Sequence, residues 1–424
     1  MKRKAEKMLI YFDLTELFYA MSEKVPYYGI ARTVQEVGYE LALMNENVRF
    51  VIFSPYHKRF FQIAPIIDET DPDRILDLDL PPQARPKRLR RSRAHVRHWL
   101  ERVVSDLLRR GSDQQRWEMI PSARVKEVHM DGKVLISLSQ PRIISDYMHC
   151  LKEQGQRPRL LPMLHDLIPL HDMKKRKYNE NFLKDNRYIL ENCEMVIANS
   201  EFTRDEILRF ASAGLLPEAK DVRVVPLAYE LRGCSELVTE GVLALKDYIL
   251  CVGSMPGRKN LEIVLDAVLM LEEAEQKAPD IVLAGAYRKR VMRLIDEPRY
   301  ARIRDKITTV ISPEQLELGL LYKGARAVVL PSYIEGWGLP AAEALWLGTP
   351  AIVSDIPVMR EVVQDLGLYF DPEKPVELAA HLMTVFEDES FYADLKARIS
   401  QHAYSMRSWR QVAVELRGFA GRLM

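Results

Sequence analysis

The feature that most constrains the fold is a rhythm in which short apolar runs alternate with longer stretches of helical spacing. In the C-terminal half the apolar runs are rich in β-branched residues and span residues 248–253, 281–285, 307–311, 327–331, 351–354 and 368–370. Nearly continuous apolar runs of this kind are typical of parallel strands that helices cover on both faces. A helix predicted from Asn260 has its apolar residues on one face, at positions 261, 264, 265, 268 and 269. This half is therefore predicted to form a doubly wound α/β domain.

The N-terminal half repeats the same elements less regularly. Its candidate strands span residues 9–13, 49–53, 134–137, 160–164, 195–198 and 222–225. Because 424 residues suffice for two or three domains, we predict two Rossmann-like domains that face each other across a cleft. The predicted boundaries are 1–235 for the first domain, 236–404 for the second, and 405–424 for a final helix that packs back on the first. Ligands of open α/β sheets bind at the carboxyl ends of the strands, which would line this cleft.

Composition excludes several classes of protein. Apolar residues make up 47% of the chain and charged residues 29%, which is typical of a globular protein and not of a disordered or collagen-like one. The apolar run at residues 8–13 is too short for a signal peptide, and no uncharged apolar run approaches the roughly 18 residues of a membrane-spanning helix. The four cysteines contain no C-x-x-C pair and are predicted to be reduced thiols. We therefore expect a cytoplasmic protein.

The most informative segment follows the fourth of the C-terminal strands. Residues 330–345 read LPSYIEGWGLPAAEAL; they leave a strand, form a loop with Gly336 and Gly338, and begin a helix. Backbone N–H groups at the beginning of such a helix bind anions, phosphate above all. Glu335 in the loop and Glu343, expected in the first helical turn, are placed to accept hydroxyl groups of a sugar or a ribose. Taken alone, the pattern is equally compatible with one loop carboxylate and one carboxylate that the helix dipole stabilises.

A second segment lies at the same predicted edge of the sheet. The first strand of the domain ends at Gly253, and the turn GSMPGRKN leads into the helix, with Asn260 as its expected N-cap. Arg258 and Lys259 are thus expected beside a helix N-terminus, where a guanidinium fork and an ammonium group suit a diphosphate. An isolated Arg-Lys pair is more often a solvated turn, but here two anion-binding elements share one edge.

Together these two elements resemble the retaining glycosyltransferase family 4, which has the GT-B fold. The likeness extends to SPEQL…LYKGA (312–325), SDIPVMRE and GLYFD (354–371), ANSEFTR (198–204) and VVP (224–226). It covers most of residues 8–60 and 130–424. The family has a glycine loop after the first strand; here the segment reads YYGIAR, which keeps Gly29 and has a tyrosine where a second glycine often stands.

The resemblance implies that the first domain (1–235) is the acceptor side and that the second (236–404) binds the nucleotide-sugar donor. It also implies roles for individual residues. Arg258 and Lys259 would hold the diphosphate of a nucleotide-sugar donor, Glu343 its ribose, and Glu335 a hydroxyl of the transferred sugar. His165, within LHDLIP, matches a first-domain histidine that lies close to the donor sugar in this family. His165, Glu335, Arg258 and Lys259 form the predicted catalytic set. The other predicted donor-binding residues are Gly29, Gly253, Gly336, Trp337, Gly338 and Leu339.

The implied activity is the retaining transfer of a hexose from a nucleoside-diphosphate sugar, such as GDP-mannose or a UDP- or dTDP-sugar. The acceptor would be a hydroxyl of a glycan or lipid-linked saccharide, in the biosynthesis of surface polysaccharide or lipopolysaccharide. Two alternatives remain open. One is another nucleotide-sugar enzyme, such as an epimerase or a phosphorylase-like protein. The other is a protein that binds nucleotide-sugars without catalysis.

No cofactor and no metal are expected, because Arg258 and Lys259 can neutralise a diphosphate. The acidic pairs at 71–73 and 77–79 match the D-x-D of metal-dependent transferases, but their charged, Pro-rich surroundings favour an exposed loop. The His-Asp pairs at 165–166 and 171–172 are the other candidate ligands.

The small net charge conceals a basic cluster. The chain has 61 Lys and Arg against 60 Asp and Glu, a formal charge of +1, yet residues 85–110 contain ten basic residues and two acidic ones. Apolar residues at 96, 100, 103 and 107 predict an amphipathic helix after a basic arm, within an insertion near 70–130 of the first domain. Such a segment can cover its own domain, lie on the anionic inner face of the membrane, or bind nucleic acid. We favour them in that order.

Overall fold

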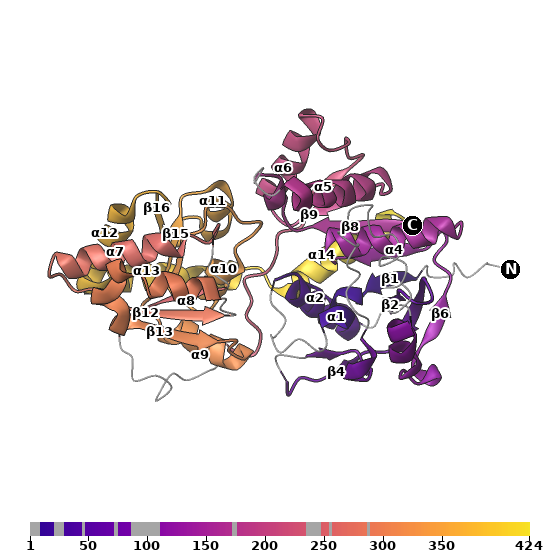
Figure 1. The fold of residues 1–424 in the computed structure, drawn as a ribbon, viewed down its shortest axis with the longest axis horizontal. Helices are drawn as coiled ribbons and strands as arrows, with labels where there is room; N and C mark the ends of the chain where they lie inside the picture. Colours follow the sequence, from indigo (N-terminus) through magenta and orange to yellow (C-terminus); the bar gives the residue numbers. More distant parts are fainter. Residues whose placement is uncertain are drawn as a thin grey trace. The chain divides into compact units, whose positions relative to one another are not determined.

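The computed structural model describes residues 9–20, 29–44, 47–71, 75–85, 111–171, 176–234, 247–253, 257–285 and 289–424. The chain divides into two compact units, drawn in Figure 1. Unit 1 comprises Met1–Asn199, Thr203–Val225 and Arg410–Met424, and unit 2 comprises Ser200–Phe202 and Pro226–Trp409. Residues 86–110, with nearly all of the predicted basic arm and its amphipathic helix, lie outside the described residues.

Within the described residues, the sheet of unit 2 has six parallel strands in the order β13-β12-β11-β14-β15-β16. They are β11 (Tyr248–Val252), β12 (Asp280–Gly285), β13 (Ile307–Ile311), β14 (Ala327–Leu330), β15 (Ala351–Ser354) and β16 (Leu368–Phe370). The helices of this unit are α7 (Leu261–Glu273), α8 (Lys289–Ile295), α9 (Gln315–Gly324), α10 (Leu339–Trp346), α11 (Pro357–Val363), α12 (Pro375–Glu387) and α13 (Glu389–His402). All six strands predicted for this half are confirmed.

The strand order of unit 2 changes direction at β11, which pairs with both β12 and β14. The chain first builds the sheet outward through β12 and β13, and then crosses to the other side of β11. In doubly wound sheets a crevice opens at the carboxyl ends of the strands on either side of such a switch point. The predicted site segments follow the strands β11 and β14, so the topology brings both of them to this point.

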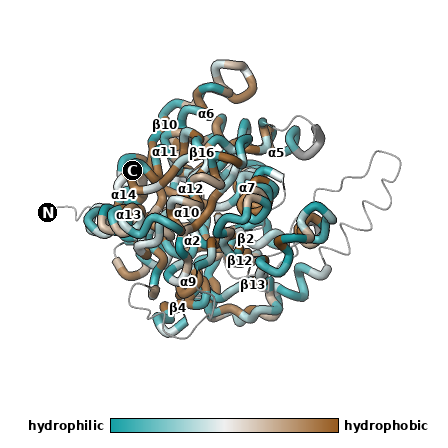
Figure 2. Tube along the Cα trace, turned by 90° about the vertical axis from the view of Figure 1, so that its left-hand side faces the viewer, coloured by the Kyte–Doolittle hydropathy of each residue, from teal (hydrophilic) through white to brown (hydrophobic). Residues whose placement is uncertain are grey.

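Burial follows the apolar pattern in the central strands but not at the edge strand β13. Leu261, Val264 and Val268 of α7 pack into the core of unit 2, as their spacing predicts. The strands β11 and β14 are buried throughout. The edge strand β13 was expected to be covered on both faces, but this is wrong: Ile311 is 69% exposed. The strand β13 lies at the edge of the sheet, with a neighbouring strand on one side only. Its apolar sequence does not distinguish an edge strand from a central one. The alternation of hydrophilic and hydrophobic residues along the helices can be followed in Figure 2.

The part of unit 1 that the structure describes has an eight-stranded sheet in the order β10-β9-β8-β7-β1-β2-β3-β6. Its strands are β1 (Ile10–Asp13), β2 (Val48–Ser54), β3 (Arg59–Ile63), β6 (Lys126–Val128), β7 (Val134–Ser137), β8 (Arg159–Leu164), β9 (Val196–Ala198) and β10 (Val222–Val224). The six predicted strands form its parallel part, and β3 and β6 extend it with antiparallel pairing that was not predicted. The direction of the strand order changes at β1, which pairs with β2 and β7.

The helices of unit 1 include α1 (Thr15–Ala20), α2 (Ile30–Met44), α4 (Pro141–Glu153), α5 (Arg176–Glu191) and, in part, α6 (Glu201–Ser212). The last helix, α14 (Trp409–Arg422), belongs to unit 1 from Arg410 onward. Arg159 Nη1, at the beginning of β8, donates to the carbonyl oxygens of Leu423 and Met424 at 2.6 and 2.8 Å. All four cysteines lie among the described residues and are free thiols, as predicted.

Candidate functional site

One backbone hydrogen bond and one from a side chain hold the two predicted motifs of unit 2 together. The N–H of Tyr333, in the loop after β14, donates to the carbonyl oxygen of Arg258 at 2.9 Å. In return, Arg258 Nη1 donates to the carbonyl oxygen of Ile334 at 2.9 Å. The loops that follow β11 and β14 are therefore neighbours at the switch point, as their position at the end of adjacent strands requires.

Glu335 lies between the two predicted cations. Lys259 Nζ is 2.5 Å from Glu335 Oε1, and Arg258 Nη1 is 3.0 Å from Oε2. Ser332 Oγ donates a third hydrogen bond to Oε1 at 2.7 Å. The side chains of Glu335 and Lys259 are 8% and 14% exposed, whereas that of Arg258 is 41% exposed. The arrangement is a largely buried carboxylate with one shielded and one solvent-facing cation.

The electrostatics of this cluster keep Glu335 ionised. Burial by itself raises the pKa of a carboxyl group, but the charges of Lys259 and Arg258 and the hydrogen bonds to Lys259 and Ser332 outweigh it and lower the pKa of Glu335 to about 2. At neutral pH Glu335 therefore carries a full negative charge that offsets part of the positive charge of the two cations. Both cations are paired with Glu335 in this structure.

Gly338 allows the loop to turn into α10. Gly338 has φ +94° at the N-cap position of the helix, a left-handed conformation that favours glycine, and a Cβ there would overlap Met359 Cε. Leu339 is the first residue of α10. Glu343 was expected in the first helical turn, which is wrong: with this cap the helix begins at Leu339, so Glu343 lies in its second turn. Glu343 is 2% exposed and accepts a hydrogen bond from Tyr322 Oη at 2.8 Å.

The loop after β11 also depends on glycine. Gly253 has φ +118°, and its N–H donates to the carbonyl oxygen of Ala284. Gly285, at the end of the neighbouring β12, has φ +150°, and a Cβ there would lie 2.9 Å from the carbonyl oxygen of Gly253. The backbones of Gly253 and Gly285 thus approach each other more closely than any side chain permits.

Asn260 does not cap α7 as predicted. It occupies the N-cap position, but its φ of +50° is left-handed instead of extended, and its side chain makes no capping hydrogen bond. The side-chain amide donates instead to the carbonyl oxygen of Pro372 at 2.8 Å. Asn260 therefore ties the beginning of α7 to the segment that follows β16.

Gly336 and Trp337 continue the loop after Glu335. Trp337 is 4% exposed, and its ring meets that of Tyr229 edge to face, with centroids 6.1 Å apart. The hydroxyl of Tyr229 donates to the carbonyl oxygen of Val362 at 2.6 Å. Trp337 thus anchors the loop in the interior of unit 2.

The two predicted site residues of the first domain belong to unit 1. His165 directly follows β8, is buried, and has Nε2 2.7 Å from the carbonyl oxygen of Leu138. Because a carbonyl can only accept, this contact assigns the proton to Nε2 and leaves Nδ1 as the acceptor. Burial lowers the pKa of His165 to about 4, against a smaller opposite effect of that hydrogen bond, so the imidazole is neutral at pH 7.

Gly29 directly precedes α2. It has φ +61°, and its carbonyl oxygen accepts from the N–H of Thr33 at 3.0 Å. No atom lies within 4 Å of a Cβ built on Gly29, so its conformation and not its size favours glycine there. The cleft between the two domains stays a prediction.

The candidate metal ligands are dispersed or otherwise engaged. Among the described residues, no three or more His, Cys, Asp and Glu side chains are grouped as a metal site. Asp166 Oδ1 accepts from the N–H of Ile168, and Asp77 Oδ1 accepts from that of Asp79. His171 pairs with Glu206. Asp73 and Asp172 lie outside the described residues. Within the same part of the chain, no helix has the length and apolar character needed to cross a membrane.

Two supporting residues were missed by the sequence analysis. Ser332 fixes Glu335, and Tyr322 fixes Glu343, which is 21 residues away in the chain. Tyr322 lies within residues 312–325 and Ser332 within residues 330–345, both of which resemble the family. A buried hydroxyl beside a carboxylate has no sequence signature. Tyr322 reaches Glu343 because α9 packs against α10, and Ser332 reaches Glu335 because of the conformation of the loop after β14.

The fold of the chain is GT-B, with two α/β units: the sheet of unit 2 is parallel, and that of unit 1 is parallel except for β3 and β6 at one edge. Sucrose-phosphate synthase from Thermosynechococcus elongatus is similar over 98% of this chain and 99% of its own, with a TM-score of 0.64 and 18% identity. The Anabaena protein HepE, solved in complex with UDP and glucose, is similar over 98% of this chain and 100% of its own, with a TM-score of 0.60 and 14% identity.

Residues 244–406 match the family model for glycosyl transferases group 1, and this match confirms the predicted resemblance for that part of the chain. The O-antigen chain mannosyltransferase B of Escherichia coli is 28% identical over 57% of this chain, and the mannosyltransferase RfbU of Salmonella typhimurium is 25% identical over 57%. The chain spans 64% of the length of each of these two relatives.

Proposed function

We propose that the chain is a glycosyltransferase that moves a sugar from a nucleoside-diphosphate sugar to a hydroxyl of a saccharide acceptor, with retention of the anomeric configuration and without a metal. The observation that carries the proposal is the cluster of Arg258, Lys259 and Glu335 at the switch point of unit 2, beside the N-terminus of α10. Cations and helix N–H groups suit a diphosphate, and a buried ionised carboxylate suits a sugar hydroxyl.

The chemistry requires stabilisation of the leaving group. When the bond between the anomeric carbon and the diphosphate oxygen breaks, its electron pair stays on the diphosphate, which gains negative charge. Arg258, Lys259 and the N-terminus of α10 are set to stabilise that charge before it forms. The acceptor oxygen then bonds to the anomeric carbon and loses its proton to the departing phosphate oxygen, which balances the reaction.

Glu335 has two tasks in this proposal. Without donor, it holds Lys259 and Arg258 in place and prevents their mutual repulsion. With donor, the diphosphate supplies the counter-charge, and an oxygen of Glu335 becomes able to accept a hydroxyl of the sugar. Glu343 would accept a ribose hydroxyl, oriented by Tyr322. His165 would act as a neutral residue that accepts through Nδ1.

We propose mannose as the transferred sugar and GDP-mannose as the first donor to test, ahead of UDP- and dTDP-sugars, because the two curated relatives are named as O-antigen mannosyltransferases. The same names favour a role in surface polysaccharide biosynthesis. The setting would be the cytoplasm, with residues 85–110 in peripheral contact with anionic lipid and no role in nucleic-acid binding.

The test is release of nucleoside diphosphate by the full chain, measured with and without a mannose-terminated oligosaccharide. Release that requires acceptor, survives EDTA and gives a product whose anomeric configuration matches the donor supports the proposal. Arg258→Gln and Lys259→Gln should each lower turnover at least tenfold, whereas Lys396→Gln, an exposed cation on α13, should not. Conversion of the nucleotide-sugar to its epimer without acceptor would establish the epimerase alternative instead.

A further inference from the structure

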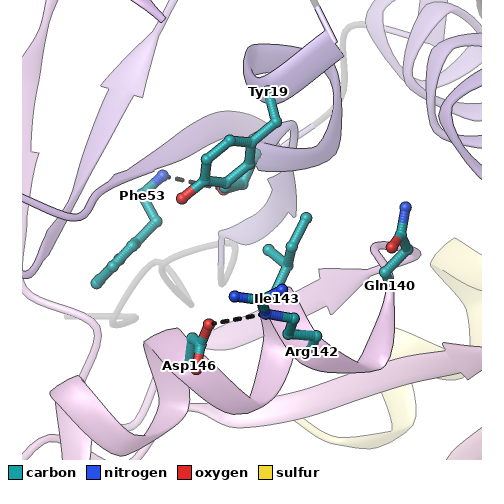
Figure 3. Close-up of a pocket in the computed structure, with 7 residues that line it drawn as sticks. Tyr19, Phe53, Gln140, Arg142, Ile143 and Asp146 are labelled. Carbon is teal, nitrogen blue, oxygen red and sulfur yellow. Dashed lines mark hydrogen bonds and ion pairs between the residues drawn. The ribbon is translucent and has the colours of Figure 1, made fainter. Parts of the chain in front are cut away.

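A pocket opens in unit 1 at the switch point of its own sheet. It is lined by Thr15, which follows β1, by Phe53 near the end of β2, and by Gln140, which follows β7. Tyr19 of α1 and Arg142 and Asp146 of α4 complete the wall (Figure 3). Carboxyl ends of strands at a switch point are where α/β sheets bind ligands.

The pocket has the size of a small ring. Its volume is about 80 Å³, whereas about 10–15 Å³ on the same measure holds one water molecule. Figure 3 shows Tyr19 on one side of the pocket and Arg142 and Asp146 on the other. Aromatic side chains on one wall and polar groups on another suit a ligand with both C–H faces and hydroxyl groups.

Arg142 and Asp146 supply the polar groups. They lie one turn apart on α4, and Arg142 Nε is 3.8 Å from Asp146 Oδ2, beyond a direct hydrogen bond. Arg142 Nη2 is buried and has no hydrogen-bond partner within the described residues. A buried donor without a partner is costly, and a ligand oxygen at this position would remove the cost. A guanidinium and a carboxylate side by side donate to one hydroxyl and accept from the next.

The charges of the pocket favour an uncharged ligand. Arg142 and Asp146 are its only charged lining residues among those described, and their charges cancel. A phosphate or carboxylate would meet the repulsion of Asp146 together with the attraction of Arg142. A neutral polyol meets no such opposition, because each of its hydroxyls can both donate and accept.

The frame beneath the pocket is fixed by buried hydrogen bonds. Asp13, at the end of β1, accepts from the N–H of Thr15 at 2.9 Å and from Ser137 Oγ, at the end of β7, at 2.7 Å. Glu16 accepts from the backbone N–H of Gln140 at 3.0 Å and from its Nε2 at 2.8 Å. The strand ends that carry the wall are therefore locked to each other, which is the preorganisation a binding site requires.

We infer that this pocket binds an uncharged pyranose ring, the terminal sugar of the acceptor, with Arg142 and Asp146 as its hydroxyl ligands. The inference rests on the proposed function, which it deepens by naming the class of acceptor and the residues that select it. A saccharide end without a charged group is the acceptor that this site selects.

The test separates acceptor binding from turnover. Binding of methyl α-D-mannopyranoside to the full chain is measured by ligand-observed NMR, with inorganic phosphate as the competing probe. Arg142→Gln and Asp146→Asn should each weaken mannoside binding at least tenfold and raise the KM for a mannose-terminated acceptor by a similar factor. Binding of GDP, measured by calorimetry, should not change. The matched control is Asp205→Asn on α6, whose side chain is 64% exposed and which should leave mannoside binding intact.

Three results would overturn the inference. They are mannoside binding that both variants retain, competition by phosphate that depends on Arg142, and acceptor-KM values that stay unchanged. Failure of the proposed function has a different signature, since the wild-type chain would then bind neither GDP nor any other nucleoside diphosphate. Arg142 is 41% exposed on its helix, so its variant should keep the thermal transition of the wild type. Tyr19→Phe, which removes one hydroxyl from the opposite wall, is a second, milder variant.

Discussion

Replacing Glu335 by glutamine should destabilise unit 2 at neutral pH, because it removes the only charge that separates Lys259 from Arg258 in the described cluster. Glutamine keeps the shape of a protonated glutamate, so the cost equals the preference of the folded state for the ionised form. The fall in pKa from 4.5 to about 2 corresponds to roughly 3 kcal/mol, at about 1.4 kcal/mol per pH unit. Arg258 is 41% exposed and its share is screened, so we expect a loss of about 1–3 kcal/mol.

The pH dependence of this loss has a definite sign. The pKa of Glu335 is lower in the folded than in the unfolded chain, so the unfolded chain binds more protons as the pH falls. The stabilisation is complete above the ordinary pKa of 4.5 and is lost as the pH approaches 2. Between pH 7 and pH 3.5 the difference between wild type and Glu335→Gln should shrink by up to about 1.4 kcal/mol.

The assay must report on unit 2 alone, since a two-unit chain need not unfold in one step. Denaturant-dependent hydrogen exchange of peptides from β11 and β14 gives the free energy of opening of that unit. Glu317→Gln, an exposed glutamate on α9, is the matched control and should change the free energy by less than about 0.5 kcal/mol. The reasoning is refuted if Glu335→Gln is as stable as wild type at pH 7, or if its deficit does not shrink in acid.

Two further predictions concern backbone geometry and a buried titration. Gly285→Ala should destabilise unit 2 by more than about 1–2 kcal/mol, because the new Cβ would meet the rigid carbonyl of Gly253 and because alanine disfavours a φ of +150°. The measurement is thermal unfolding. The control is Gly132→Ala, where φ is also positive but no atom lies within 4 Å, so the difference between the two variants reports the steric share of the destabilisation. His165 should stay neutral down to about pH 4; an NMR titration of its imidazole carbon, assigned with His165→Gln, contradicts this if the signal shifts between pH 7 and pH 5.5.

The sequence predicted strands well where they are buried and parallel, and poorly where they are not. The strands β11 and β14 are continuous apolar runs whose ends carry the site, so the pattern located both strand and loop. The strand β6 was missed because two of its three residues, Lys126 and Glu127, are charged and exposed. Such an edge strand is stabilised by its pairing with β3, a tertiary contact that leaves no periodic trace.

The sequence predicted the residues of the candidate site but not the ion pairs between them. Motif spacing placed Arg258, Lys259 and Glu335 at one edge, yet nothing in the spacing shows that Glu335 neutralises both cations. The turn position of Glu343 was missed because the boundary of α10 depends on the left-handed φ of Gly338, a property of one backbone angle. Arg142 and Asp146 have an i, i+4 spacing that is common on helices, so the sequence alone did not single them out. Their position in the lining of the pocket does.

Unit 1 is discontinuous in the chain, and this affects the order in which the protein can be completed during synthesis. Residues Arg410–Met424 belong to unit 1 but follow all of Pro226–Trp409. At about 5–20 residues per second, a ribosome needs on the order of 10–40 s to make that intervening stretch. Throughout this interval unit 1 lacks the helix whose Val412, Ala413 and Leu416 are fully buried in the finished protein. Unit 1 can therefore reach its final packing only after unit 2 has been synthesised, because these buried side chains are added last.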